Sequence, residues 1–253
     1  IQAAELLRDR LWGSCYAAVV TSATLRALGS FDTLKRETGL PNSAHFMAVA
    51  GAFDYANAAV IRVPKDAVEG NSIEDHSRYI VDNLASLVAP RCGTLVLFSS
   101  RRQMEGVFDE LSNDLQKQIL IQGQYSNREM IRLHKERIDQ GKTSVLLGLA
   151  SFAEGVDLPG DYCRHVVIAK LPFAVPDEPL QEALAEWIED RGGNSFFDIS
   201  LPVASLRLIQ ACGRLLRTES DSGTVTILDK RLITKRYGAQ LLNALPPFRR
   251  EIG

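Results

Sequence analysis

The feature that most constrains this chain is the regular alternation of short apolar runs with longer helical patterns. The apolar runs carry Val, Ile and Leu at successive positions, which is typical of strands buried on both faces. The expected strands are Ala17–Thr21, Ala58–Val63, Thr94–Phe98, Ile119–Ile121, Ser144–Leu147, His165–Ala169 and Thr224–Leu228. The expected helices are Glu74–Ala89, Arg101–Leu111, Arg128–Gln140, Leu180–Asp190, Ser205–Leu216 and Lys235–Ala244, with Asn127 and Ser205 as N-caps. This order predicts an α/β fold with a mainly parallel sheet flanked by helices.

Length and charge set the next limits. The 253 residues can form one large α/β domain or two small ones. A net charge of −2 excludes a uniformly basic nucleic-acid binder, but it leaves room for a local binding groove. No apolar run approaches the roughly 20 residues that a membrane span needs, and no signal-peptide pattern is present, so we expect a cytoplasmic protein with no membrane partner. The charged, helix-like run Glu5–Arg10 begins almost at once, and we therefore expect a piece of a longer protein.

Cysteine and histidine residues are scattered along the chain. The four cysteines give no CxxC pair, so reduced and mostly buried thiols in a cytosolic protein are the expected state. The spacing of the four histidines likewise gives no argument for a metal site. The residues are Cys15, Cys92, Cys163 and Cys212, and His45, His76, His134 and His165.

Two short segments resemble parts of a nucleotide site without fitting it. Gly141-Lys142-Thr143 resembles the end of a phosphate-binding P-loop, but that loop must follow a strand and open a helix. Here the tripeptide closes a predicted helix and leads into a strand, so Gly141 is expected to act as a helix cap. Asp177-Glu178 resembles a magnesium-binding acidic pair, yet it lies between two prolines and is expected to form a turn. The chain therefore lacks both parts needed to bind ATP and magnesium by itself.

The segment Gln210–Arg217 carries the strongest chemical signal. Gln210, Arg214 and Arg217 are spaced by four and three residues, so a helix would place them along one face. Guanidinium groups offer fork-like donors that suit the outer oxygens of a triphosphate. Gly213 would let this face approach another backbone closely. The competing interpretation is an amphipathic helix with solvated arginines.

The segment Phe152–Gly160 follows an expected strand and contains two carboxylates and two glycines. Ligands meet such sheets at the carboxyl ends of the strands, which favours a functional loop here over a simple capped turn. Glu154 and Asp157 could orient an arginine or bind a sugar hydroxyl, and Gly155 permits close approach of backbone.

Polar residues also follow three other expected strands. Ser22 and Thr24 come after the first and could link a nucleotide site to a nucleic-acid site by hydrogen bonds. The run Ser99–Arg102 opens a helix, where hydroxyls and Arg can contact a phosphate backbone or simply cap the helix. The candidates are Ser99, Ser100 and Arg101, together with Gln122 after the next strand.

The segments TSATL, LVLFSSRRQM, SFAEGVDLPGD, QACGRLLR and TILDKRL occur in an order that resembles motifs III, IV, V and VI of superfamily 2 helicases. In detail they are most similar to the DinG branch of the XPD-like helicases, over about Leu11 to Phe248. The resemblance implies one RecA-like helicase C-terminal domain over residues 1–253, with residues 1–11 as a lead-in from a preceding lobe. It also implies ATP, Mg²⁺ and DNA as partners of a 5′→3′ helicase that opens duplexes, forks or R-loops.

The resemblance further assigns roles to the candidate residues. It implies that Gln210, Gly213, Arg214 and Arg217 face an ATP held by the N-terminal lobe of the parent. It places Glu154, Gly155 and Asp157 between nucleotide and DNA, and it lets Ser22 and Thr24 couple the two sites. An iron–sulfur cluster would lie elsewhere in the parent. Two alternatives stay open, namely a degenerate lobe that binds nucleic acid or a partner without catalysis, and a stand-alone nucleotide enzyme that uses Gly141-Lys142.

Overall fold

A parallel β-sheet forms the centre of the molecule in the computed structural model, which describes residues 3–173 and 179–253. Seven strands are found in the described residues, in the order β3-β4-β2-β5-β6-β1-β7. Every neighbouring pair is parallel. The strands are β1 (Ala59–Val63), β2 (Gly93–Phe98), β3 (Ile119–Ile121), β4 (Ser144–Leu149), β5 (His165–Ile168), β6 (Gly223–Ile227) and β7 (Arg249–Ile252). The predicted α/β class with a mainly parallel sheet is confirmed.

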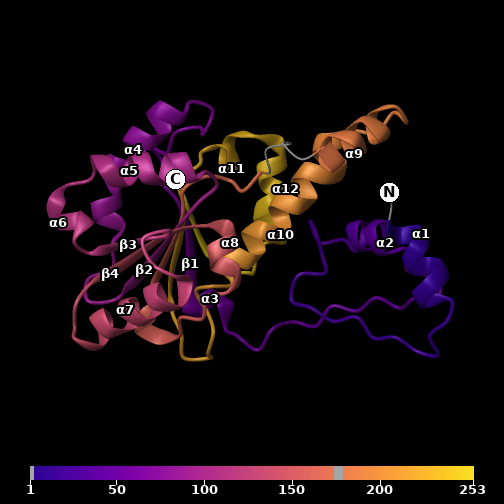
Figure 1. The fold of residues 1–253 in the computed structure, drawn as a ribbon, viewed down its shortest axis with the longest axis horizontal. Helices are drawn as coiled ribbons and strands as arrows, with labels where there is room; N and C mark the ends of the chain where they lie inside the picture. The colour runs from indigo at the N-terminus through magenta and orange to yellow at the C-terminus, as the bar shows by residue number, and fades with distance from the viewer. Residues whose placement is uncertain (1–2, 174–178) are drawn as a thin grey trace.

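Helices cover both faces of this sheet and connect its strands (Figure 1). The longer ones are α4 (Ile73–Leu87), α5 (Arg101–Glu110), α7 (Asn127–Asp139), α9 (Pro179–Glu189), α10 (Leu201–Cys212) and α12 (Arg236–Ala244). The shorter ones are α1 (Ala3–Leu7), η1 (Arg8–Trp12), α2 (Asp32–Thr38), α3 (Tyr55–Ala58), α6 (Asn113–Gln116), α8 (Ala150–Glu154), η2 (Gly160–Tyr162), η3 (Phe196–Ser200) and α11 (Arg231–Thr234).

The core is divided into two apolar layers by the alternation of side chains along the strands. On β2, Leu95 and Leu97 pack into one layer with α7, α8, α10 and α12. Val96 and Phe98, which point the other way, pack into the second layer with α4, α5 and α6. Because β2 is buried on both faces, its last four residues, Leu95–Phe98, are all apolar, and this produces the continuous apolar run in the sequence.

Two strand expectations differ from the structure. The run Ala17–Thr21 forms no strand and is exposed, because no other strand of the described chain pairs with it. The edge strand β7 was not expected, because its sequence RREI is mostly charged and each of its residues is exposed. Pairing with β1 and the ion pair of Arg62 with Glu251, at 2.6 Å, hold β7 in place.

Residues 3–54 form a unit apart from the sheet, in which the short helices α1, η1 and α2 pack together and the rest is irregular (Figure 1). Trp12 Nε1 donates to the Thr38 carbonyl at 2.7 Å, and the Phe31 and Phe46 rings lie 5.2 Å apart. The Leu28 N–H donates to Ser205 Oγ at 3.3 Å, which ties this unit to α10. The single-domain assignment over residues 1–253, with 1–11 as a lead-in, stays a prediction.

The expected N-caps are displaced. Ser126, rather than Asn127, caps α7 by accepting the Glu129 N–H at 3.3 Å. Ser205 does not begin a helix: it is buried within α10, which starts four residues earlier at Leu201 with Pro202 in its first turn.

Candidate functional site

The turn after α10 carries the two candidate arginines. The helix ends at Cys212 with Gly213 as its C-cap, so the expected single helical face of Gln210, Arg214 and Arg217 is wrong. Only Gln210 lies on the helix, in its last turn. The α-helical hydrogen bonds stop after Gly213, because the Arg214 and Leu215 N–H groups bond to carbonyls three residues back, at 3.1 and 3.2 Å. The Arg217 N–H then bonds to the Asp221 carboxylate at 2.7 Å.

Both arginines reach the loop that follows α8. Arg214 Nη1 donates to the Val156 carbonyl at 3.0 Å, and Arg217 Nε donates to Asp157 Oδ1 at 2.7 Å. The two segments singled out by sequence are therefore in contact, on the sheet face that α8 and α10 cover. Arg214 is half-buried and its bond to a carbonyl fixes the loop. The Arg217–Asp157 pair is open to water, since the Asp157 side chain is 69% exposed, so it can exchange partners at low cost.

Glu154, Gly155 and Gly213 are the other candidates in these two segments. Glu154 ends α8, and its side chain lies outside the described side chains. Gly155 is exposed, and a Cβ there would meet no atom within 4 Å, so nothing in this chain requires glycine. Gly213 is tighter, because a Cβ would lie 3.3 Å from the Ile209 carbonyl oxygen. The close approach that both glycines permit toward another backbone stays a prediction.

A third carboxylate that was not singled out from the sequence joins the same loop and turn. Asp221 is 4% exposed, and its Oδ1 accepts the Gly160 N–H at 2.9 Å. Its Oδ2 accepts the N–H groups of Arg217 and Thr218 at 2.7 and 2.8 Å. The spacing Asp221-x-Gly223 just before a strand was the available signal, since a short polar residue there commonly caps a turn.

Four of the candidate nucleic-acid residues follow the ends of two strands, β2 and β3. β3, β4 and β2 are adjacent and parallel, so the segments after β2 and β3 share one edge of the sheet. Ser100 caps α5 by accepting the Gln103 N–H at 3.4 Å, while Ser99 and Arg101 are exposed. Gln122 Oε1 accepts the Leu149 N–H at 2.8 Å, which ties the end of β3 to the end of β4.

Ser22 and Thr24 lie in an irregular segment rather than at a strand end. The Ser22 hydroxyl accepts the Thr24 N–H at 3.2 Å, and Ser22 is exposed. Their expected position after a strand is wrong, because the preceding run has no pairing partner in the described chain. Their coupling role stays a prediction.

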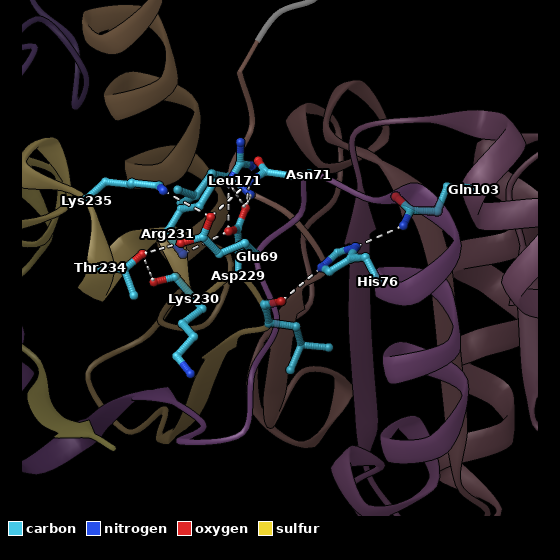
Figure 2. Close-up of polar contacts among 11 residues, drawn as sticks. Glu69, Asn71, His76, Gln103, Leu171, Asp229, Lys230, Arg231, Thr234 and Lys235 are labelled. Carbon is cyan, nitrogen blue, oxygen red and sulfur yellow. Dashed lines mark hydrogen bonds and ion pairs between the residues drawn. The ribbon is translucent and has the colours of Figure 1, made fainter.

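The segment Asp229–Arg231, noted from sequence without an assigned role, forms a buried ion pair at the end of β6 (Figure 2). Asp229 is fully buried and accepts from Arg231 Nη2 at 2.6 Å and from the Leu171 N–H at 3.0 Å. Burial raises the pKa of Asp229, but Arg231 and the backbone donors outweigh it and hold the pKa below its ordinary value. Glu69 and Lys235 extend the network with an ion pair of 3.0 Å. All these groups find partners within the chain.

The buried histidines also find partners within the chain. The Gln103 Nε2 group can only donate, and it lies 2.9 Å from His76 Nδ1, which therefore accepts (Figure 2). The proton of the neutral His76 ring is then on Nε2, which donates to the Leu228 carbonyl. His134 lies between Ser144 Oγ and the Tyr162 carbonyl, at 2.9 and 2.8 Å. Burial lowers the pKa of His134 to about 4, which keeps its ring neutral.

Among the described residues, the cysteines form no disulfide, and the side chains that could bind a metal form no common site. Cys163 and Cys212 are buried, and burial raises the pKa of each to about 12, while Cys15 and Cys92 are half-buried. No group of three or more His, Cys, Asp or Glu side chains that could hold a metal occurs among the described residues. No helix in the same part of the chain is both long and apolar enough to cross a membrane.

The two segments that resemble a nucleotide site can now be placed. α7 ends at Asp139, Gly141 adopts a φ of +70°, and β4 begins at Ser144. The segment follows a helix and leads into a strand as predicted, although the C-cap is Gln140 and Gly141 is the residue after it. The order helix–loop–strand is the reverse of a P-loop. Asp177 and Glu178 lie outside the described residues.

Comparison with known proteins places this chain in a family. Residues 84–248 match the family described as "Helicase C-terminal domain". The chain is 43% identical over 251 residues to the ATP-dependent DNA helicase DinG of Photobacterium profundum, covering 97% of this chain and 36% of that protein. It is 39% identical over 255 residues to the protein of that name from Escherichia coli (strain K12), covering 98% of this chain and 35% of that protein. The chain thus spans about a third of the length of these relatives.

Solved structures share the fold. One titled "XPD_Helicase" superposes with a TM-score of 0.57 at 22% identity, covering 78% of this chain and 36% of the other. The "Structure of S. tokodaii Xpd4" gives 0.58 at 16% identity, covering 88% and 43%. The family match spans more than half of the chain and includes both arginines, the loop after α8 and Asp221. This chain therefore belongs to the helicase C-terminal domain family, in the form found in DinG-type helicases.

Proposed function

We propose that this chain is the second motor lobe of an ATP-dependent 5′→3′ DNA helicase, and that it completes an ATP site held by another lobe of the parent protein. The observation that carries the proposal is the contact between the loop after α8 and the turn after α10, through Arg217 and Asp157. An arginine paired with an exposed carboxylate can leave that carboxylate for a phosphate, because the exposed ion pair is weak.

The two arginines take different roles in this proposal. Arg217 is the finger: its guanidinium moves from Asp157 to the γ-phosphoryl and stabilises the charge that spreads over the outer oxygens during transfer. Arg214 supports the site by holding the Val156 carbonyl, and hence the loop, at a fixed distance. Gln210, in the last turn of α10, adds an uncharged donor next to the turn in the sequence.

Magnesium and most of the ATP contacts belong to the other lobe. This chain's Gly141-Lys142-Thr143 follows a helix, so it offers no helix N-terminus to phosphates. Mg²⁺ bound with ATP supplies neutralisation of the phosphate charge. The residues of this chain provide the arginine donors and the walls that exclude water. An iron–sulfur cluster, if the parent has one, would lie outside this chain.

Single-stranded DNA is the proposed ligand of the sheet edge formed by the ends of β2, β3 and β4. Ser99, Ser100 and Arg101 offer donors to phosphate oxygens at the start of α5, and Gln122 offers its amide group beside them. Forked or R-loop DNA would supply the strand. Ser22 and Thr24 are proposed to couple the closing of the ATP site to DNA binding at this sheet edge. The parent is proposed to act in the cytoplasm.

ATP binding by the isolated chain tests this proposal. Titration of the 253-residue chain with Mg²⁺-ATP should give no saturable binding below millimolar concentrations, with no hydrolysis and only weak, salt-sensitive binding of single-stranded DNA. The full-length parent should bind and hydrolyse ATP. Tight, magnesium-dependent ATP binding by the isolated chain would support the stand-alone enzyme instead. A full-length parent that binds DNA but never hydrolyses ATP would support the degenerate lobe.

A further inference from the structure

Asp221 joins the two segments of the proposed ATP site more completely than any arginine does. Its carboxylate accepts four hydrogen bonds, from the N–H groups of Gly160, Arg217 and Thr218 and from the Thr218 hydroxyl, at 2.7 to 2.9 Å. Gly160 lies three residues after Asp157, the carboxylate that holds the Arg217 side chain. The loop after α8 and the turn after α10 are therefore joined at three points: by Arg214 to the Val156 carbonyl, by Arg217 to Asp157, and by Asp221 to the Gly160 N–H.

We propose that Asp221 is a positioning residue that sets where the Arg217 guanidinium lies relative to the loop after α8. The inference rests on the proposed function of Arg217 and adds to it the group that fixes the backbone from which the arginine extends. The Arg217–Asp157 bond is exposed and exchangeable, so it cannot hold the arginine once a phosphate competes for it. The Asp221 bonds are buried and persist when that exchange occurs.

An ionised carboxylate is needed at this position. Burial raises the pKa of Asp221, but the Thr218 hydroxyl and the backbone N–H groups outweigh burial and lower it. Asp221 Oδ1 accepts from the Gly160 N–H and the Thr218 hydroxyl, and Oδ2 accepts from the Arg217 and Thr218 N–H groups. Asparagine has a single acceptor oxygen, so its NH₂ group must replace one of these two oxygens. The Thr218 hydroxyl can turn to accept from that NH₂ group, whereas the Gly160 N–H cannot. The Asp221→Asn variant should therefore keep the turn and lose the link to Gly160.

The test is a double-mutant cycle on DNA-stimulated ATP hydrolysis by the full-length parent. Asp221→Asn should lower kcat by about 10- to 100-fold, because a displacement of about 1 Å is enough to misplace a catalytic group. The KM for ATP and the affinity for single-stranded DNA should change by less than about threefold. Asp161→Asn is the matched control: that carboxylate is 61% exposed and pairs with Arg164 rather than with Arg217, so its kcat should stay at the wild-type value.

The cycle separates positioning from folding. If Asp221 acts through Arg217, the double variant Asp221→Asn/Arg217→Ala should be as slow as Arg217→Ala alone. A double variant that is slower by the full Asp221→Asn factor would overturn the inference and leave the proposed role of Arg217 standing. Equal losses of ATP binding, DNA binding and kcat in Asp221→Asn, with a lower unfolding temperature, would also overturn it. Wild-type turnover in Arg217→Ala would overturn the proposed finger and the inference together.

Discussion

His134 and His165 make the stability of this chain depend on pH between 6.5 and 4. Both rings are buried, and burial lowers the pKa of each from 6.5 to about 4. Arg137 and Lys135 disfavour a charge on His134 further, and Arg62 does so for His165. In the unfolded chain both rings bind a proton below pH 6.5, whereas in the folded chain they stay neutral until about pH 4. The unfolded state therefore binds more protons in this window, and stability falls as the pH falls.

The magnitude follows from the two pKa values. Between pH 7 and pH 5, a histidine shifted from 6.5 to about 4 lowers the free energy of unfolding by about 2 kcal/mol. Two such residues give about 4 kcal/mol, which is a large part of the roughly 5–15 kcal/mol typical of a folded domain. Buried carboxylates with lowered pKa values, such as Asp229, lose their contribution only below about pH 4. The interval from pH 7 to pH 5 therefore isolates the histidines.

Urea unfolding of the 253-residue chain at pH 7, 6 and 5 measures this effect. The variant His134→Gln keeps a donor for the Tyr162 carbonyl and removes the titrating ring. It should be less stable than the wild type at pH 7, but its free energy of unfolding should fall by about 2 kcal/mol less between pH 7 and pH 5. An unchanged pH dependence in this variant would refute the reasoning, because His134 would then titrate alike in the folded and unfolded states.

Three further variants test other contacts. Asp229→Ala leaves Arg231 buried without its carboxylate and should lower the free energy of unfolding by about 3–5 kcal/mol in a urea titration. Gly93→Ala should cost about 1–3 kcal/mol in the same assay, because a Cβ would collide with the Tyr162 carbonyl. Arg101→Ala in the full-length parent should weaken single-strand binding and reduce the slope of log affinity against log salt by about 0.7, as measured by fluorescence anisotropy. An unchanged slope would show that Arg101 does not contact the DNA at the proposed sheet edge.

Much of the sheet could be predicted from sequence, because parallel strands buried on both faces leave continuous apolar runs. The sequence gives the wrong prediction for two segments, because pairing with another strand, rather than composition, decides whether they form strands. Ala17–Thr21 has the residues of a buried strand, yet it pairs with nothing in the described chain. Arg249–Ile252 has the residues of a solvated loop, yet it pairs along β1. Whether a segment finds a strand to pair with cannot be read from the segment itself.

The sequence predicts which residues belong to the candidate site more accurately than how they are arranged. The contact between the loop after α8 and the turn after α10 follows from the fold, and no local pattern reveals it. The helix was placed four residues too late, although Pro202 and Gly213 marked its first and last turns. Asp221 was overlooked because a single Asp before a strand is common in turns, and only the structure shows the four donors that converge on it.

The arginines after α10 are proposed to complete an ATP site across a cleft between two lobes. The most direct test is the rate of ATP hydrolysis by the full-length parent with saturating single-stranded DNA, for Arg217→Ala and Arg214→Ala. Arg78→Ala is the control, since that side chain is 64% exposed on α4, over the other sheet face. We expect kcat to fall by about 10³- to 10⁵-fold for Arg217→Ala, by less for Arg214→Ala, and not at all for the control. Undiminished turnover in Arg217→Ala and Arg214→Ala would contradict the assignment.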